Sequence, residues 1–496
     1  MNLGISSIDL AIIVLYIIGT LFIGWYVSKR VSGYEDFSIG GRSFGPFILA
    51  ATFGATNFST WSLVGKPGMV YGSGISVVWL AWNAMACVAA AVFFIPIYRK
   101  LRYHTMSEIF EDRYNGVNRG LISILWILAD TFNRYGVTVF ASALILSLIL
   151  DVSVNYMILL MAVLVLALTF IGGIVSVVIT DAIQFVLMWA GLFIGSIYIL
   201  SHFNGLSGLV ESVPANLVDW VPSAASATGW PWIIALTVLG FPYFITSQFV
   251  MQRGLGAKTV NVARWGMLFA AVLAIPMAIM EIIPGLAARV MLDPETVKNM
   301  NPDMIGPEIY LQLLPVGAVG IFFSSLLAAG MSTADSALCG ASSLFTEDFY
   351  KKARPNLSEK HYLKVTRMAT IVLCVIGTAW AFLVPKLGGV INSILTIIAI
   401  TDMPIFIIIC LAVFWRKMNA KGALAAILSG TIAGGIVSSV GMGVGGIQNL
   451  AITTATSTLT ALTMGIIISL VTSRNTVEQK RVDNFFSKLS AADKEL

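Results

Sequence analysis

The stretch GPFILAATFGATNFSTWSLVGKPGMVY, residues 45–71, has the length of a membrane span but is interrupted by small and polar residues. Gly54 precedes the mostly polar run 56–60, and Pro67 stands in the second half. Hydroxyl side chains compete with the helical hydrogen-bond ladder, and proline removes one donor from it. We therefore predict a transmembrane helix that is broken near Asn57.

The rest of the chain has the composition of a membrane protein. Of its 496 residues, 57% are hydrophobic and 11% are charged, with a mean hydropathy of +0.88, whereas a soluble domain has roughly 25% charged residues. Apolar runs of about 20 residues follow one another along the chain, which predicts an all-α polytopic membrane protein. The sequence shows neither a P-loop nor paired catalytic motifs, so we expect a protein that is not an enzyme and has no nucleic-acid partner.

The apolar runs give about thirteen candidate spans. They lie near residues 8–28, 46–71, 74–98, 120–150, 154–174, 176–201, 230–251, 265–288, 314–346, 368–385, 390–415, 422–444 and 451–473. The break at Gly172 and Gly173 is the least distinct of the divisions.

The basic residues predict how the spans are oriented. If the N-terminus lies outside, 25 of the 30 Lys and Arg residues fall in inner segments, and the outer segments hold only Arg289, Lys298 and Lys386. Because basic residues accumulate on the cytoplasmic side, we expect the N-terminus outside and the C-terminus inside. This predicts a multi-pass protein of the cell membrane with a cytoplasmic tail, residues 474–496.

A second interrupted helix lies five spans after the first. The stretch TVLGFPYFITSQ, residues 237–248, contains Gly240 and Pro242 within an apolar run. Interrupted helices in corresponding positions of two halves are typical of inverted-repeat transporters, whose unwound carbonyls suit Na⁺. We therefore expect one transporter domain over residues 1–496. Its predicted parts are an extra helix (8–28), a first repeat (46–201), a second repeat (230–415), two extra helices (422–473) and the tail.

Ionisable residues within the predicted spans are a second sign of function, because each costs free energy at bilayer depth. They are Lys66, Asp130, Arg134, Asp181, Glu281, Asp335 and Asp402. For Glu281 and Asp402, the alternative is a structural ion pair or a position that reaches water. Asp130 and Arg134 are four residues apart, so a local pair on one helix face is also possible.

Five separated stretches, in order, resemble the sodium/solute symporter family, which takes up proline, pantothenate, sugars, sialic acid and monocarboxylates. They are SGYEDFSIGGRSFGP (32–46), FIPIYRKLRYHTMSEIFEDRYN (94–115), GGIVSVVITDAIQFVLM (172–188), QFVMQRGLGAKT (248–259), and MSTADS with FTEDFYKK (331–352). The resemblance implies a thirteen-span protein with a LeuT-type 5+5 inverted-repeat core over spans two to eleven.

The resemblance also implies a sodium site, with Na⁺ as the coupling ion. Its ligands by position are Ala55, Phe58, Ala329, Ser332 and Thr333, from the broken second span and the ninth span. Some relatives bind a second sodium, and Asp181 and Ser336 match those positions. Asp335 stands where such a relative carries Ser, so it either strengthens a second sodium site or carries a proton.

The substrate is expected between the two broken spans. Candidate contacts are Asn57, Ser59, Ser62, Lys66, Trp79, Trp82, Asn83, Arg134, Phe241, Tyr243, Phe244 and Gln248. In a sialic-acid relative the arginine at the place of Arg134 holds the substrate carboxylate. We therefore expect import of a carboxylate-bearing solute, namely an organic acid, an amino acid or an acidic sugar, by alternating access. The alternatives are a neutral solute such as a sugar, with Arg134 neutralised by Asp130, and proton-coupled transport. The expected partners are this small molecule and the lipid bilayer, with the protein acting as a monomer.

Overall fold

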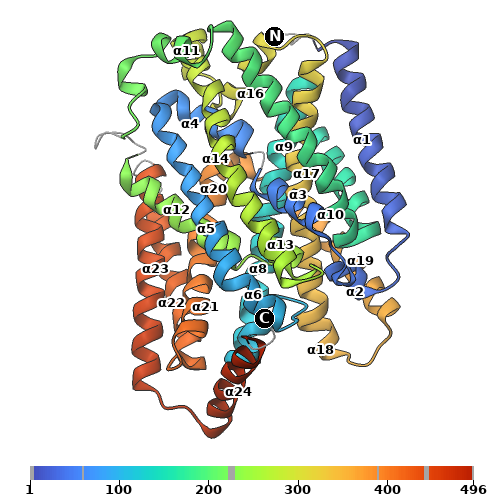
Figure 1. Cartoon of the computed structure of the whole chain (residues 1–496), viewed down its shortest axis with the longest axis vertical. Coiled ribbons are helices and arrows are strands. Elements are labelled where there is room, and N and C mark those ends of the chain that lie inside the picture. Colours follow the sequence, from blue (N-terminus) through green and yellow to red (C-terminus); the bar gives the residue numbers. More distant parts are fainter. Residues whose placement is uncertain (1–4, 59–60, 222–228, 388–389, 441–445, 494–496) are drawn as a thin grey trace.

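The computed structural model describes residues 5–58, 61–221, 229–387, 390–440 and 446–493. These residues form helices joined by short connections, and most of the long helices run along the long axis of the molecule (Figure 1). Among these residues, Phe44 and Ala257 form an isolated parallel β-bridge.

The helices are given in chain order under the predicted parts of the chain, and that division stays a prediction. The first helix and the first predicted repeat contain α1 (Ser7–Ser28), α3 (Pro46–Asn57), η2 (Trp61–Gly65), α4 (Lys66–Ser73), η3 (Gly74–Trp82), α5 (Asn83–Ala89), η4 (Ala90–Phe94), α6 (Ile95–Lys100), α8 (Gly116–Leu128), η5 (Ala129–Val137), α9 (Thr138–Leu150) and α10 (Val154–His202). The second predicted repeat contains α12 (Trp230–Ile245), α13 (Gln248–Leu255), α14 (Val260–Met291), α17 (Ala318–Leu344), η8 (Phe345–Tyr350), α18 (Lys351–Ala353), α19 (Glu359–Ala381), α20 (Val390–Ile397), η10 (Ile398–Asp402) and α21 (Met403–Phe414).

The remaining elements are the last helices and the short connections. The last helices are α22 (Ala420–Val440), α23 (Gly446–Val471) and α24 (Thr476–Asp493). The connections contain α2 (Tyr34–Ile39), η1 (Gly40–Arg42), α7 (Glu108–Arg113), α11 (Leu206–Ser212), η6 (Ala215–Leu217), α15 (Pro294–Lys298), η7 (Pro302–Met304), α16 (Ile305–Leu313) and η9 (Val384–Leu387).

Local sequence explains where several long helices begin. Ser6 caps α1 in a capping box with Asp9, and Pro46 opens α3. Thr259 and Ser358 accept backbone N–H groups at the starts of α14 and α19. These side chains satisfy amide donors that the first helical turn leaves unpaired.

Nine described helices are long and apolar enough to cross a membrane, or ten if the bent pair α12 and α13 counts as one span. The thirteen predicted spans exceed these ten by three. The prediction divides α10 into two spans and counts residues 46–71, which contain the short helix α3, as a span of their own. It also includes the continuous helical stretch 116–150, which carries three ionisable residues. The protein is a multi-pass membrane protein, and the number thirteen stays a prediction.

Gly173 divides α10 in two. It has φ 52° and ψ −144° inside an otherwise helical segment of 49 residues, which would be about 70 Å long if straight, roughly twice the hydrocarbon thickness of a bilayer. A Cβ atom at Gly173 would lie 2.5 Å from the ring of Phe37. Since both the backbone angle and this close approach require glycine, the break expected at Gly172 and Gly173 is present in the structure.

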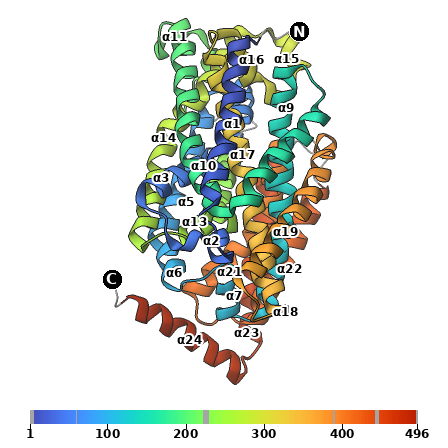
Figure 2. The same cartoon turned by 90° about the vertical axis from the view of Figure 1, so that its right-hand side faces the viewer.

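The helices pack into one body with an apolar exterior. Helix α10 packs along α17, α3 packs on α14, and α22 pairs with α23. Large apolar side chains are exposed on many of the long helices, among them Phe22, Val163, Trp265, Val375, Ile432 and Leu459. Such an exterior suits contact with lipid chains. Helix α24 lies across the end of the molecule opposite the N-terminus (Figures 1 and 2).

Candidate functional site

The two helices that the sequence predicts to be broken are broken in the structure. Helix α3 ends at Asn57, Phe58 is extended with φ −99° and ψ 103°, and the next described helical element begins at Trp61. The second break separates α12 from α13, which meet at an angle of 45°. There the carbonyl of Pro242 accepts the amide hydrogens of Thr246 at 2.9 Å and Ser247 at 3.3 Å.

The broken helices contact each other at these breaks. The Tyr243 hydroxyl donates to the carbonyl of Thr56 at 3.3 Å. The chain preceding α3 is also joined to the chain following α13, because Phe44 donates to the Gly256 carbonyl at 3.1 Å and accepts from the Lys258 amide at 3.0 Å. The two interrupted helices are thus tied together in two places, which suits them to move as one unit.

The residues predicted to bind sodium lie on neighbouring helices. Ala55 and Phe58 are buried at the end of α3, and Ala329, Ser332 and Thr333 lie on α17, which contacts α3. The Thr333 hydroxyl donates to the Ala329 carbonyl at 3.0 Å, and the Ser332 hydroxyl donates to Oδ1 of Asp181 at 2.5 Å. These hydroxyls therefore bond to other protein groups, and a five-oxygen sodium site stays a prediction.

Asp181 belongs to a buried group that we call the Arg253 cluster: Thr52, Asp181, Arg253, Ser332, Asp335 and Ser336. Arg253 Nη2 donates to Asp181 Oδ2 at 3.0 Å and to Ser336 Oγ at 2.5 Å, while its Nε donates to Thr52 Oγ1 at 2.7 Å. Thr52 in turn donates to Asp181 Oδ2 at 2.5 Å. The cluster joins four helices, α3, α10, α13 and α17, at one point.

Asp335 is the least satisfied member of this cluster. Its Oδ1 accepts from the Ser336 hydroxyl at 3.2 Å, whereas its Oδ2 is buried without a hydrogen-bond partner among the described residues. The predicted second sodium site named Asp181, Asp335 and Ser336, and the structure brings these three residues together. Whether they bind a sodium ion stays a prediction.

Arg253 is a residue of this cluster that was not predicted from the sequence, where it counts only among the basic residues of the inner segments. In the structure its side chain is fully buried on α13 and also donates to the carbonyl of Phe249. The available signal was its position in QFVMQRGLGAKT, directly after a broken span and among apolar residues. A basic residue near a helix end fits the positive-inside pattern equally well. The number of basic residues on the inner side therefore gave no sign that Arg253 pairs with Asp181.

A second buried group, the Arg134 cluster, consists of Asp130, Arg134, Ser247 and Asp402. Arg134 Nη1 donates to Asp130 Oδ1 at 2.6 Å, and its Nη2 pairs with Asp402 and donates to Ser247 Oγ at 3.2 Å. The local pair considered for Asp130 and the structural ion pair considered for Asp402 are both present. Because the Arg134 side chain is only 3% exposed and already faces two carboxylates, its positive charge is compensated within the protein.

Lys66 also has a carboxylate partner. Its ammonium group pairs with Glu281 of α14, and the Ser62 hydroxyl is hydrogen-bonded to the same carboxylate. Both carboxylate and ammonium are buried. The structural ion pair considered for Glu281 is thus present, and it removes the free charge that made Lys66 a candidate anion-binding residue.

Other predicted substrate contacts lie around the broken helices. Asn83 lies against Gly240, where an added Cβ would be 2.4 Å from its side-chain oxygen. Trp82 stacks on Trp230 at 5.8 Å between ring centroids and meets Trp79 edge-on at 5.1 Å. These aromatic rings join η3 to the beginning of α12.

The remaining candidates on α12 and α13 make mainly protein contacts. Tyr243 meets the ring of Phe244 at 4.9 Å, and Phe241 packs against Phe406 at 5.9 Å between ring centroids. Gln248 is fully buried, and its Oε1 accepts the amide hydrogen of Met106 at 2.8 Å. Ser59 lies outside the described residues, as does the side chain of Asn57.

Each arginine cluster combines two carboxylates with one guanidinium, so each has a formal charge of −1 when every group is ionised. Each also contains one carboxylate oxygen that is buried without a partner among the described residues, Asp130 Oδ2 or Asp335 Oδ2. An uncompensated charge is costly in a dry interior. A proton or a small monovalent cation would compensate it.

Two broken helices in contact, with buried carboxylates beside them in a multi-pass protein, are features of a secondary transporter. The model of the sodium:solute symporter family matches residues 37–430. The chain belongs to this family.

Comparison with curated proteins gives sodium-coupled relatives that transport polyols and sugars. The chain is 28% identical to a sodium/glucose cotransporter of Vibrio parahaemolyticus, over 86% of this chain and 84% of the relative. It is 28% identical to sodium/myo-inositol cotransporter 2 of Oryctolagus cuniculus, over 86% and 69%. It is also 28% identical to a sodium/mannose cotransporter of Bos taurus, over 87% and 78%.

Comparison with solved structures shows that the fold of this chain is similar to that of known transporters. A Na⁺-coupled sialic acid symporter in a substrate-bound, outward-open state aligns with a TM-score of 0.81 at 21% identity, covering 94% of this chain and 98% of that chain. Mhp1, a nucleobase-cation-symport-1 family transporter, aligns with a TM-score of 0.61 at 16% identity, covering 91% and 99%. The protein is therefore a transporter and not an enzyme, and its family supports sodium-coupled symport of a small molecule.

Proposed function

We propose that this protein imports a small, neutral, hydroxyl-rich solute together with sodium across the cell membrane by alternating access. The observation that carries the choice of solute is the pairing of Arg134 with both Asp130 and Asp402. A guanidinium held between two carboxylates has little electrostatic attraction left for a third, and binding an anionic substrate there would require one pair to open.

The other basic side chains of the site support the same choice. Lys66 is paired with Glu281, and Arg253 is paired with Asp181. The two arginine clusters have an excess of carboxylate, so an anionic solute between them would be repelled unless cations bound first. A sugar or polyol carries no such penalty and can exchange hydrogen bonds with amide, hydroxyl and indole groups.

The curated relatives support this class independently. Their names describe glucose, myo-inositol and mannose cotransport, and these solutes are neutral and rich in hydroxyl groups. The carboxylate-bearing substrate expected from Arg134 stays a prediction, and the ion pairs of Arg134 favour its alternative.

In this proposal, sodium binding between the end of α3 and α17 stabilises the outward-facing arrangement that binds the solute. Because the coupling of two ligands is reciprocal, the bound solute also raises the affinity for sodium. Inward opening separates α3 from α17, which weakens the sodium site and releases the ion. A membrane potential adds roughly 2.3 kcal/mol per charge for each 100 mV.

Tracer uptake into proteoliposomes tests the proposal. Full-length protein would be reconstituted with potassium inside, and uptake of radiolabelled myo-inositol, glucose, mannose, N-acetylneuraminate and proline would be measured with sodium or potassium outside. We expect saturable uptake of at least one neutral polyol or sugar that requires external sodium.

Two further conditions distinguish the alternatives. An inward pH gradient without sodium tests proton coupling, and uptake driven by it alone would contradict sodium coupling. Sodium-dependent uptake confined to N-acetylneuraminate or proline would show that the solute class is wrong while leaving symport intact. Protein-free liposomes give the background for each tracer.

A further inference from the structure

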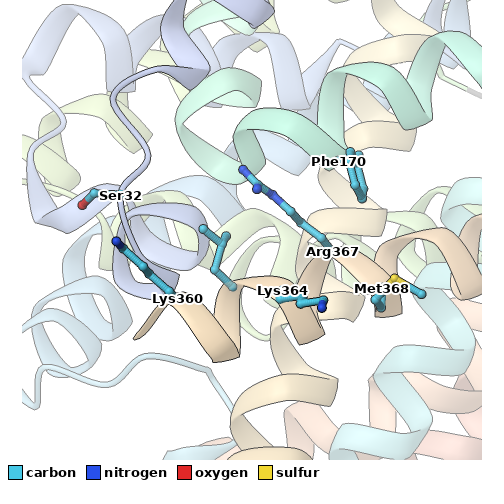
Figure 3. A pocket seen from close by; sticks show the side chains of 7 residues that line it. Ser32, Phe170, Lys360, Lys364, Arg367 and Met368 are labelled. Atoms are coloured by element: carbon cyan, nitrogen blue, oxygen red, sulfur yellow. The ribbon is translucent and has the colours of Figure 1, made fainter. Parts of the chain in front are cut away.

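A cavity of about 490 Å³ lies outside the candidate transport site, at the beginning of α19. We call it the α19 pocket, and its lining includes Ser32, Phe170, Lys360, Lys364, Arg367 and Met368. Figure 3 shows Lys360, Lys364 and Arg367 along α19, with Ser32 and Phe170 contributed by other segments. The pocket therefore combines three basic side chains with apolar ones.

The basic side chains share one side of α19 because they are four and three residues apart. Lys360 and Lys364 are exposed, and none of the three basic residues has a carboxylate within 4 Å among the residues that the structure describes. The nearby carboxylates have other partners. Asp36 accepts from the backbone and hydroxyl of Ser32 at 2.9 and 2.7 Å, and Glu359 accepts the amide hydrogen of Glu35 at 3.3 Å.

The Arg367 side chain is held in position by two contacts. Its Nη2 donates to the Ile171 carbonyl at 2.9 Å, two residues before the break at Gly173, and its guanidinium lies 5.8 Å from the centre of the Phe170 ring. Its Nε is buried and has no hydrogen-bond partner in the described part of the chain. A buried donor without a partner is costly, and an acceptor in the pocket would lower this cost.

The pocket continues into an apolar face of the same helix. Met368, Val372, Val375 and Ile376 are all exposed, at spacings that keep them on one side of α19. In a membrane protein this face contacts lipid chains. The positive-inside pattern assigns the beginning of α19 to the inner side, where anionic lipids attract basic residues. A ligand that spans both regions needs an anionic end and an apolar tail.

We propose that the α19 pocket binds one anionic phospholipid, with its phosphate among Lys360, Lys364 and Arg367 and its acyl chains along the exposed face of α19. Free phosphate could pair with the three basic side chains, but it has no apolar part to contact the exposed face of α19. A zwitterionic phospholipid matches the apolar face, but its positive headgroup opposes three uncompensated basic residues. This inference is independent of the transported solute, because it concerns the outer surface of the helix bundle.

The test uses purified full-length protein in neutral detergent, with dioleoylphosphatidylglycerol as the probe. Lipid retention would be measured by native mass spectrometry, and the thermal unfolding midpoint would be followed as lipid is added. The variant K360Q/K364Q/R367Q removes the three basic groups. We expect it to weaken retention of the anionic lipid by roughly tenfold or more, and to abolish the rise in the unfolding midpoint.

A matched control removes the same charge elsewhere on the predicted inner side. Lys258, Lys417 and Lys421 are exposed and form no ion pair among the described residues. K258Q/K417Q/K421Q is therefore expected to retain the lipid as the unaltered protein does. Equal losses in the two triple variants would indicate a diffuse surface charge and overturn the proposal.

Two additional measurements separate lipid binding from misfolding and from binding of the headgroup alone. Lys364→Glu changes one exposed side chain and should fold normally, so a loss of lipid retention in this variant cannot come from misfolding. Glycerophosphate, which has the headgroup but no acyl chains, should not raise the unfolding midpoint. Stabilisation by glycerophosphate equal to that by the lipid, or by dioleoylphosphatidylcholine equal to that by the anionic lipid, would contradict the assignment.

Discussion

The Arg253 cluster and the Arg134 cluster have the same charged groups but different surroundings. Each contains one arginine and two aspartates, but Arg134 pairs with both of its aspartates, whereas Arg253 pairs with Asp181. Phe249 links the clusters, since its carbonyl accepts from Arg253 and its ring lies 4.9 Å from Arg134. Three hydroxyl side chains take part in the hydrogen bonds of the Arg253 cluster. Two take part in those of the Arg134 cluster, namely Ser247 and Thr401, which donates to Asp402 Oδ1 at 3.2 Å.

This difference assigns different chemistry to the two clusters. Hydroxyl and carboxylate oxygens together can replace the hydration shell of a small hard cation, so the Arg253 cluster is suited to bind sodium. The Arg134 cluster offers mainly direct ion pairs and joins η5 to η10 beside the break between α12 and α13. We infer that the first cluster senses the cation, while the second holds the helices that surround the solute.

The largest expected effect comes from Asp181→Asn. It removes the carboxylate that accepts from Thr52, Arg253 and Ser332. Breaking a buried ion pair costs about 3–5 kcal/mol, so the unfolding free energy should fall markedly. If a second sodium site exists, the sodium concentration for half-maximal uptake should also rise by roughly tenfold or more. Thermal unfolding and the sodium dependence of tracer uptake measure the two effects.

Asp402→Asn is the matched control from the other cluster. Arg134 keeps Asp130 as a partner in this variant, so the loss of stability should be smaller and the sodium dependence should stay unchanged. Loss of stability without a change in sodium dependence for Asp181→Asn would mean that Asp181 serves only as the partner of Arg253. A raised sodium requirement in Asp402→Asn would remove the distinction between the clusters.

A smaller effect is expected from Ser332→Ala and Thr333→Ala. Each removes one hydroxyl predicted to bind sodium, and a hydrogen bond or ligand oxygen of this kind contributes about 1 kcal/mol, or roughly fivefold in affinity. Ser332→Ala should have the larger effect because it also leaves Asp181 with one hydrogen bond fewer. The sodium dependence of uptake at saturating solute measures both.

Ser342→Ala controls for this pair. Ser342 lies on the same helix, is fully buried, and donates to the Cys339 carbonyl at 3.2 Å. It has no predicted role in sodium binding, so its removal should leave the sodium requirement unchanged. An unchanged requirement in Ser332→Ala and Thr333→Ala as well would argue that these hydroxyls only bond to protein groups.

The breaks in α3 and between α12 and α13 could be predicted from sequence because they are local events. Gly54, the mostly polar run 56–60, Gly240 and Pro242 all weaken a helix wherever it packs. The charge pattern and apolar runs likewise predicted a polytopic helical protein. The division at Gly173 was expected but indistinct, since a glycine pair in an apolar run does not reveal a positive φ angle.

The partners of the buried charges could not be predicted in the same way. Asp130 and Arg134 are four residues apart, so their pairing was considered from sequence. Asp402 is 268 residues from Arg134, and Asp181 is 72 residues from Arg253. Such pairs depend on how the helices are arranged in space, and no local pattern encodes them. The substrate hypothesis built on Arg134 therefore could not include its second carboxylate.

The third prediction concerns Asp335, whose Oδ2 is buried without a hydrogen-bond partner among the described residues. Asp335→Ser removes one negative charge from the Arg253 cluster, so the remaining Asp181 and Arg253 form a neutral pair. We expect fewer cations to be transported per solute, because less charge needs compensation. The reversal potential of solute-coupled current across a reconstituted membrane, recorded at several pH values, measures this number.

The outcome also shows whether Asp335 binds a proton or a sodium ion. If the pH dependence of the reversal potential disappears in the variant, Asp335 carries a proton. If the sodium dependence changes at constant pH, it contributes to a second sodium site. An unchanged reversal potential under all conditions would show that Asp335 neither carries a proton nor contributes to a sodium site, and the charge argument for this cluster would fail.

The smallest effect on solute affinity is expected from Arg134→Lys, and it separates the two substrate classes. Lysine keeps a positive charge near Asp130 and Asp402 but cannot form the fork-shaped bonds of a guanidinium. If the solute is neutral, its affinity should fall by less than about fivefold, the equivalent of roughly 1 kcal/mol. Isothermal titration of the solute in saturating sodium measures this, and Arg253→Lys provides the comparison. That variant should alter the sodium requirement instead. A hundredfold loss of solute affinity confined to Arg134→Lys would mean that one ion pair opens to admit a substrate carboxylate.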